Sequence, residues 1–226
     1  MKTLSIMIDE AGNFDMQPAS NPTYCLTLVF HDQNDCIDDQ IDYFDEGLSS
    51  LGQDPHKAVH TSPLIRREPP YQNMGREEMS KLMALTTIFV KNLPIKYKAF
   101  IFDKRESDSY NAFLGKMNSE VRMFIQNNLA FFQSFDNIII YYDRGQKEIS
   151  DLLKATFEEI FKPNVEMRLA FQYEYKLLQV ADYICTMEYS KEKWDTGRAT
   201  NSEITFFGSR RLFIKRYYAG LRKLKF

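Results

Sequence analysis

The chain has 226 residues, of which 44% are hydrophobic and 27% are charged, with a formal net charge of −2. These proportions exclude a disordered or collagen-like chain and fit one sizeable domain or two small ones. No apolar run approaches the ~18 residues that a membrane-spanning helix needs. The N-terminus meets Asp9 and Glu10 too early for a signal peptide, so we expect no membrane partner.

The cysteine content points to a reducing compartment. Cys25, Cys36 and Cys185 are odd in number and lie far apart in the sequence. A disulfide scaffold needs paired, closely spaced cysteines, so we expect free thiols and a cytoplasmic protein.

The first third of the chain predicts a hairpin followed by an acidic helix. Residues 4–9 form a short apolar run that ends in the turn sequence Asp-Glu-Ala-Gly-Asn, and residues 24–30 are rich in β-branched and aromatic side chains. Both segments are predicted strands, and residues 13–22 between them read as a loop. Residues 35–51 carry an apolar stripe at helical spacing. The stripe consists of Ile37, Ile41, Phe44, Leu48 and Leu51.

An irregular insertion follows, and the remaining chain alternates strands with helices. Residues 52–75 contain four prolines and little periodicity, and we place an insertion at about residues 32–92. The alternation after it predicts an α/β layer with crossover connections, all within a single domain 1–226. The predicted strands are 96–103, 137–143 and 165–174; the predicted helices are 77–91, 111–132, 147–161, 177–193 and a basic helix at about 203–226.

Three aspartates stand where apolar elements meet polar positions. Asp9 ends the first strand, Asp143 ends the strongest strand, and Asp182 interrupts an apolar helix. A carboxylate in apolar surroundings is costly unless it is paired, hydrogen-bonded or bound to metal. Carboxylates at the ends of neighbouring strands suit Mg²⁺ or Mn²⁺, and two such ions can promote phosphodiester hydrolysis. A turn-capping role is the structural alternative for each of them.

Four segments carry a resemblance that covers most of the chain. Residues 8–14 (Ile-Asp-Glu-Ala-Gly-Asn-Phe), 59–68, 141–145 and 178–184 together resemble the domain-of-unknown-function 3800 family, which is similar to the ribonuclease-H-like superfamily. The resemblance implies a ribonuclease-H-like α/β fold, with a central mixed sheet and helices on both faces, and a metal-dependent nuclease. Ala11 departs from the family pattern, which has serine at this position.

The resemblance implies that Asp9, Asp143 and Asp182 are the catalytic, metal-binding residues. Glu10 is a weaker candidate ligand, because neighbouring residues of a strand point to opposite faces. The Gln-x-x-Asp pattern of the family implies that Gln179 hydrogen-bonds a metal-bound water or a neighbouring aspartate.

Further candidates for substrate contact lie in the insertion and directly before the helix predicted over 177–193. His60, Arg66 and Arg67 can hold a phosphate, and His60 can also move a proton; a solvated loop is the alternative. The Gln-x-x-Asp pattern of the family implies that Lys176 contacts a phosphate; an ordinary charged junction between a strand and a helix is the alternative. His56 and His60 stand four residues apart, which permits a zinc pair, although no cysteine partner is near.

The charges are segregated along the chain. Residues 32–54 carry eight acidic side chains and no basic one, whereas residues 208–226 carry seven basic side chains and no acidic one. We place the acidic helix away from the substrate and predict nucleic-acid contacts for Arg210 and Arg211. A solvated basic face, with Phe213, Tyr217 and Leu221 anchoring the helix to the core, is the alternative.

The sequence thus predicts a divalent-metal-dependent nuclease that acts on DNA or RNA. A catalytically silent nucleic-acid-binding or protein-binding module of the same fold is the alternative. The 18 Phe and 13 Tyr also provide enough aromatic surface for a homodimer interface.

Overall fold

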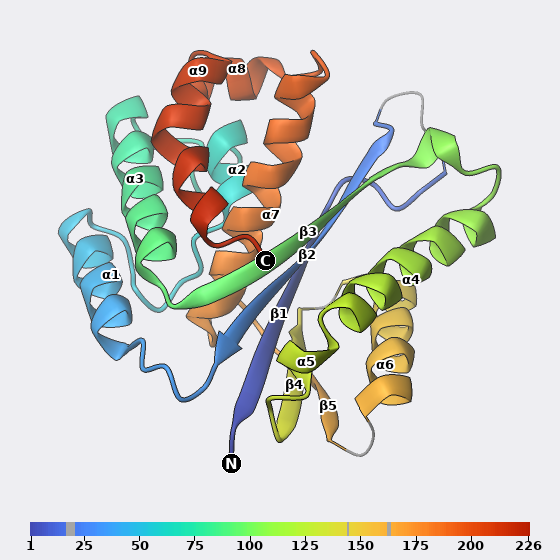
Figure 1. The fold of residues 1–226 in the computed structure, drawn as a ribbon. Helices are drawn as coiled ribbons and strands as arrows, with labels where there is room; N and C mark the ends of the chain where they lie inside the picture. Colours follow the sequence, from blue (N-terminus) through green and yellow to red (C-terminus); the bar gives the residue numbers. More distant parts are fainter. Residues whose placement is uncertain (17–20, 144, 162–163) are drawn as a thin grey trace.

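A computed structural model describes residues 1–16, 21–143, 145–161 and 164–226. Its centre is a five-stranded mixed sheet in the order β3-β2-β1-β4-β5 (Figure 1). β1 pairs antiparallel with β2 and parallel with β4, β2 pairs antiparallel with β3, and β4 pairs parallel with β5. The strands are β1 (Thr3–Ala11), β2 (Thr23–Asp32), β3 (Ile95–Asp103), β4 (Asn137–Tyr142) and β5 (Val165–Leu169). The predicted loop 13–22 lies partly outside the described residues.

Helices cover both faces of the sheet, so the α/β prediction is confirmed (Figure 1). Alternation along β1 separates the two cores: Met7 faces one helical layer, and Ile6 and Ile8 face the other. The first layer contains α1 (Asp38–Ser50), α2 (Thr61–Arg66), α3 (Arg76–Asn92), α7 (Lys176–Asp195), α8 (Asn201–Phe207) and α9 (Arg210–Phe213). The second contains α4 (Tyr110–Asn127), α5 (Leu129–Phe132) and α6 (Lys147–Phe161).

The first predicted strand and the strongest predicted strand are neighbours, as expected. β1 and β4 pair in register from Thr3 opposite Asn137 to Ile8 opposite Tyr142. Both strands run in the same direction, so their carboxyl ends lie at one edge of the sheet. Asp9 and Asp143 are therefore brought to the same edge.

In the middle of the chain, the insertion, one predicted helix and one predicted strand differ from the observed elements. The insertion is not wholly irregular, because α2 forms there with Pro63 in its first turn, where a missing N–H costs no helical hydrogen bond. The helix predicted over 111–132 is divided into α4 and α5 at Asn128, whose φ of −119° is not helical. The strand predicted over 165–174 ends at Leu169.

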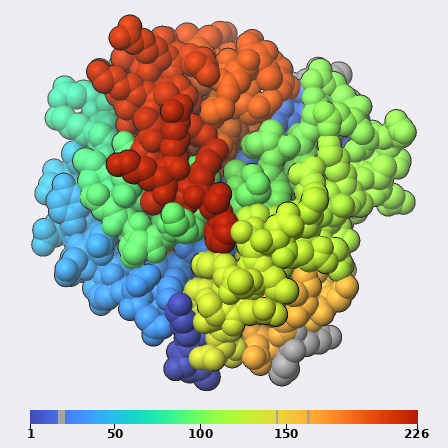
Figure 2. All heavy atoms as spheres, viewed as in Figure 1, coloured from blue at the N-terminus to red at the C-terminus, as the bar shows by residue number. Residues whose placement is uncertain are grey.

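The basic C-terminal segment is not one continuous helix. α8 ends at Gly208, whose φ of +79° favours glycine, and α9 continues into a π-helical turn (Ile214–Tyr218) and a 3-10 turn (Ala219–Lys223). The predicted anchoring stripe is confirmed, since Phe213, Tyr217 and Leu221 are buried. The segment then crosses toward α4 and α5 (Figure 2). The Phe226 ring packs 4.8 Å from that of Phe131 and 5.2 Å from that of Phe124.

Two expectations about the chain as a whole can be compared with the structure. All three cysteines are free thiols, and Cys25 and Cys185 are buried. Within the described residues, no helix is both long enough and apolar enough to cross a membrane.

Candidate functional site

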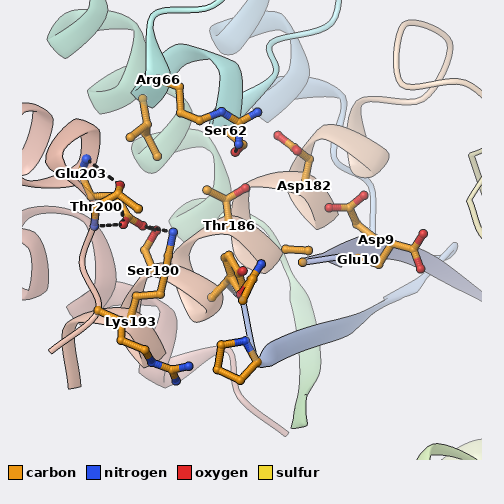
Figure 3. Close-up of a pocket in the computed structure, with 17 residues that line it drawn as sticks. Asp9, Glu10, Ser62, Arg66, Asp182, Thr186, Ser190, Lys193, Thr200 and Glu203 are labelled. Atoms are coloured by element: carbon orange, nitrogen blue, oxygen red, sulfur yellow. Dashed lines mark hydrogen bonds and ion pairs between the residues drawn. The ribbon is translucent and has the colours of Figure 1, made fainter. Parts of the chain in front are cut away.

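A cavity of about 470 Å³ opens where the carboxyl end of β1 meets α2 and α7 (Figure 3). Its volume is typical of a small-ligand site. One end is formed by β1 and α2, and the opposite end by the last turns of α7 and the start of α8. The charged residues that line it are Asp9, Glu10, Arg66, Asp182, Lys193, Arg198 and Glu203.

Two of the three predicted aspartates meet in this cavity. Asp9 lies on the face of β1 that is turned toward α7, and Asp182 lies in the second turn of α7; both line the cavity, and the Asp182 carboxylate is turned toward the start of α2 (Figure 3). Burial raises the pKa of Asp9 well above its usual range, and the negative charge of Asp182 raises it further. Burial also raises the pKa of Asp182. Two carboxyls in this arrangement either retain a proton or bind a cation.

The insertion orients Asp182. The backbone N–H of Thr61, at the start of α2, donates a hydrogen bond of 2.7 Å to Asp182 Oδ2. This bond and the charges of His60 and Arg66 lower the pKa of Asp182, although burial outweighs them. Sequence reasoning missed Thr61. The signal that indicates it is Pro63, which favours a helix start whose first N–H groups are free to bond a carboxylate.

Arg66 lies at the rim of the cavity, beside Asp182 (Figure 3). Its guanidinium binds both oxygens of Glu68 at 2.8 Å and the hydroxyl of Ser62 at 2.6 Å. Arg67 has a left-handed backbone with φ +57° and lines a neighbouring hollow instead of the cavity. The backbone N–H of His60 donates to the hydroxyl of Tyr71 at 2.9 Å.

Asp143 lies at the adjoining strand end and does not line the cavity. Pairing between β1 and β4 stops at Ile8 and Tyr142, and the next residues are Asp9 and Asp143. Asp143 directly follows β4, whereas the prediction that Asp9 ends its strand was wrong, because pairing with β2 continues β1 to Ala11. In the described part of the chain, no group of three or more His, Cys, Asp or Glu side chains is placed to hold a metal ion. The structure thus places Asp9 beside Asp182, whereas it brings Asp143 only to the same sheet edge.

Glu10 points to the opposite face of the sheet from Asp9, as strand alternation predicts (Figure 3). Its carboxylate accepts hydrogen bonds from the hydroxyl of Tyr24 and, at 3.2 Å, from the backbone N–H of Gln146. These bonds tie the end of β1 to β2 and to the segment after β4, so Glu10 holds together the strand ends that carry Asp9 and Asp143.

Gln179 supports the site through the backbone. Its Oε1 accepts from the N–H of Val59 at 3.0 Å, and its Nε2 donates to the carbonyl oxygen of Gln172 at 2.9 Å. The side chain is buried and joins the insertion to the segment that precedes α7. It therefore fixes the loop from which the Thr61 N–H reaches Asp182.

Two other candidates from the sequence lie outside the cavity. Lys176 forms an ion pair of 2.6 Å with Asp45 of α1 and donates to the carbonyl oxygen of Pro55 at 2.5 Å. His56 is exposed and lines a separate hollow next to Lys176. Lys176 therefore joins α7 to α1 and to the insertion.

The far end of the cavity holds a buried charge pair that sequence reasoning did not single out. Lys193 lies 2.6 Å from Glu203, which also accepts from Ser190 and from Thr200 (Figure 3). Burial raises the pKa of Glu203, but the bonds from Lys193 and Thr200 outweigh it and hold the pKa below the usual value. The sequence signal is the Thr-x-x-Glu capping box that begins α8. Arg198 lines the same end and donates to Thr23 at 2.9 Å.

The basic C-terminal residues and the acidic helix both lie away from this cavity. Arg210 forms an ion pair of 2.6 Å with Asp195, and neither Arg210 nor Arg211 is among the residues that line the cavity. No residue of α1 lines it either.

The donor set fits a hard divalent cation. Mg²⁺ is commonly held by one or two carboxylates, with waters and substrate phosphates completing the coordination. Asp9 and Asp182 supply two carboxylates that line one cavity, and Asp143 follows the strand that pairs with β1. No family model matches the chain, and no curated protein matches it either.

Replacement of Asp9 by Asn is expected to stabilise the metal-free protein at neutral pH. A carboxyl whose pKa is raised by folding binds its proton more tightly in the folded state than in the unfolded chain, where the pKa is about 4. The wild-type protein therefore loses stability as the pH rises from about 4 through the raised pKa, and the Asn variant avoids this part of the loss.

Thermal unfolding in EDTA at pH 5 and pH 8 measures this effect. The midpoint of Asp9→Asn should exceed that of the wild type by a few degrees at pH 8, since 1 kcal/mol shifts the midpoint by about 2–4 °C in a domain of this size. The difference should be smaller at pH 5. Asp42→Asn, which removes an exposed charge on α1, serves as the control and should change neither midpoint. A lower midpoint for Asp9→Asn at pH 8 would identify Asp9 as a structural cap.

Proposed function

We propose that the protein is a divalent-metal-dependent nuclease with a ribonuclease-H-like fold, in which Asp9 and Asp182 hold Mg²⁺ or Mn²⁺ and Asp143 assists from the adjoining strand. The observation that carries the proposal is the Asp9–Asp182 pair, whose pKa values are raised in a cavity at the carboxyl edge of the parallel strands. The mixed sheet with helices on both faces, and the sequence resemblance to the domain-of-unknown-function 3800 family, support it.

The residues of the chain have separate tasks in this proposal. Asp9 and Asp182 supply the oxygen ligands, and the Thr61 N–H keeps the carboxylate of Asp182 in place. Arg66, at the rim, provides a positive charge for a phosphate that approaches the carboxylates. A metal bound here supplies an activated water and stabilises the charge that develops on the phosphate.

The test is cleavage of labelled oligonucleotides by the purified protein. Single-stranded DNA, single-stranded RNA and duplex DNA are incubated with Mg²⁺, Mn²⁺ or EDTA. We expect at least one substrate to be cut with Mg²⁺ or Mn²⁺ and none in EDTA. A crystal soaked in Mn²⁺ should show anomalous density between Asp9 and Asp182. Absence of both cleavage and Mn²⁺ density would overturn the proposal.

A catalytically silent binding module of the same fold is the second candidate. The position of Asp143 favours this candidate, because Asp143 does not line the cavity that contains Asp9 and Asp182. Such a module should bind nucleic acid with a salt-dependent affinity that persists in Asp9→Asn, and it should cut none of the substrates with any metal.

A further inference from the structure

A second hollow, of about 420 Å³, adjoins the cavity and is lined by three arginines. Arg66 and Arg67 come from the end of α2, and Arg76 is the first residue of α3. None of the described residues that line this hollow is acidic. We call it the arginine hollow. A surface with three guanidinium groups and no lining carboxylate attracts an anion.

The arginines differ in how far their charges are neutralised. Arg66 is held by the carboxylate of Glu68. Among the described residues, the Arg67 guanidinium donates to the carbonyl oxygen of Met74 at 3.4 Å, and that of Arg76 donates to the carbonyl oxygen of Thr205. Within the described residues, neither Arg67 nor Arg76 forms an ion pair. Two guanidinium groups therefore retain donors for a bound anion.

The rest of the hollow suits a phosphate that is joined to an organic group. Asn201, Ser202 and Thr205 of α8 contribute amide and hydroxyl groups, which can bind phosphate oxygens. Phe206, which is partly exposed, contributes apolar surface against which a sugar or a base can pack.

The position of the hollow links it to the acid pair. Ile65 and Arg66 line both the arginine hollow and the cavity that contains Asp9 and Asp182. Helix α8 also borders both sites, because Glu203 lines the cavity and Ser202 lines the hollow. The two sites thus lie on either side of the contact between α2 and α8. A ligand with several phosphates can occupy both.

We propose that the arginine hollow binds a phosphodiester of the same nucleic-acid strand whose neighbouring phosphodiester lies at Asp9 and Asp182. This inference rests on the proposed nuclease function and specifies the path of the substrate over α2. It assigns strand binding to Arg67 and Arg76, on the insertion side of the cavity, instead of to Arg210 and Arg211.

The test measures strand binding separately from cleavage. A fluorescent oligo(dT) is titrated in EDTA, so that loss of the metal site and loss of the hollow are distinguishable. Arg67→Gln/Arg76→Gln is expected to weaken binding by about tenfold or more, because hydrogen bonds to a charged group are strong. The salt slope should fall by about 0.7 for each phosphate of the single strand that the variant no longer neutralises. Arg210→Gln/Arg211→Gln removes the same charge from α9 and should change binding by less than about twofold.

A second variant places a negative charge in the hollow without removing an arginine. Ser202→Glu adds a carboxylate in the first turn of α8, where an acidic residue favours the helix, so the fold should be maintained. It should weaken oligo(dT) binding, while its metal-dependent stabilisation in thermal unfolding stays that of the wild type.

Three outcomes overturn the inference. The first is oligo(dT) binding by the wild type that Arg67→Gln/Arg76→Gln leaves unchanged. The second is an equal loss of affinity in the Arg210→Gln/Arg211→Gln control, which indicates a general charge effect. The third is binding of inorganic phosphate that depends on Arg67 and Arg76 while oligo(dT) binding does not, which assigns the hollow to a separate small anion. If the wild type binds no nucleic acid under any condition, the proposed nuclease function itself fails.

Discussion

Asp182→Asn is expected to lower metal-dependent cleavage by at least about 100-fold while the protein stays folded. Loss of a group that only orients a metal ligand typically costs 10–100-fold in metal affinity or activity, so loss of a ligand should cost at least the upper end of this range. Asparagine retains an oxygen that can accept the hydrogen bond from the Thr61 N–H, so the local structure of α2 should be kept. The substitution therefore isolates the charge from the capping role.

The measurement is the cleavage rate at saturating Mg²⁺, with thermal unfolding as a check on folding. Mg²⁺ or Mn²⁺ should raise the unfolding midpoint of the wild type and leave that of Asp182→Asn nearly unchanged, since a ligand stabilises only the state that binds it. Wild-type cleavage in a folded Asp182→Asn variant would show that Asp182 is not a ligand. Reduced stability with intact cleavage would assign to Asp182 only the capping of α2.

Replacement of a second carboxylate of α7, Glu188, should lower the stability of the protein and leave its metal-dependent cleavage intact, in contrast to Asp182→Asn. Glu188 is buried and accepts hydrogen bonds from the hydroxyls of Tyr97 at 2.6 Å and Tyr218 at 3.0 Å, and Lys225 lies 2.9 Å from it. These contacts join α7, β3 and the C-terminal segment. Glu188→Ala is expected to destabilise the protein by about 2–6 kcal/mol, because it leaves the buried hydroxyls of Tyr97 and Tyr218 without their acceptor.

Denaturant unfolding of Glu188→Ala and Glu188→Gln measures this cost. Glu188→Gln should lose less stability, because its amide oxygen can still accept from a tyrosine hydroxyl. The folded fraction of either variant should cleave with the wild-type requirement for metal, since Glu188 does not line the cavity. A stability close to that of the wild type in Glu188→Ala would show that the C-terminal segment is held by its apolar stripe alone.

A comparison of Asp182 with Glu188 shows why the role of a buried acidic residue cannot be predicted from the sequence of its helix. Both interrupt the apolar pattern of one helix. Asp182 lies near another carboxylate, Asp9, and its negative charge raises the pKa of Asp9. Glu188 faces three donors on two other elements. The partners come from distant parts of the chain, so the helix sequence alone does not distinguish the two residues.

The sequence by itself determined most of the strands and helices. Apolar runs bounded by turn residues predicted β1 and β4 and placed Asp9 and Asp143 near their carboxyl ends. These features are local, because the alternation of a strand and the residue types of a turn can both be recognised within a few neighbouring residues. The facing direction of Glu10 followed from the same alternation.

Only the tertiary structure decided which polar residues meet. It placed Asp182 against Asp9 and the Thr61 N–H, engaged Lys176 with Asp45, and opened the arginine hollow between α2, α3 and α8. The α2 helix is six residues long and has little stability of its own, so periodicity does not reveal it. It forms because packing against α7 and α8 fixes it. The insertion, irregular in its sequence pattern, thus supplies one wall of the candidate site.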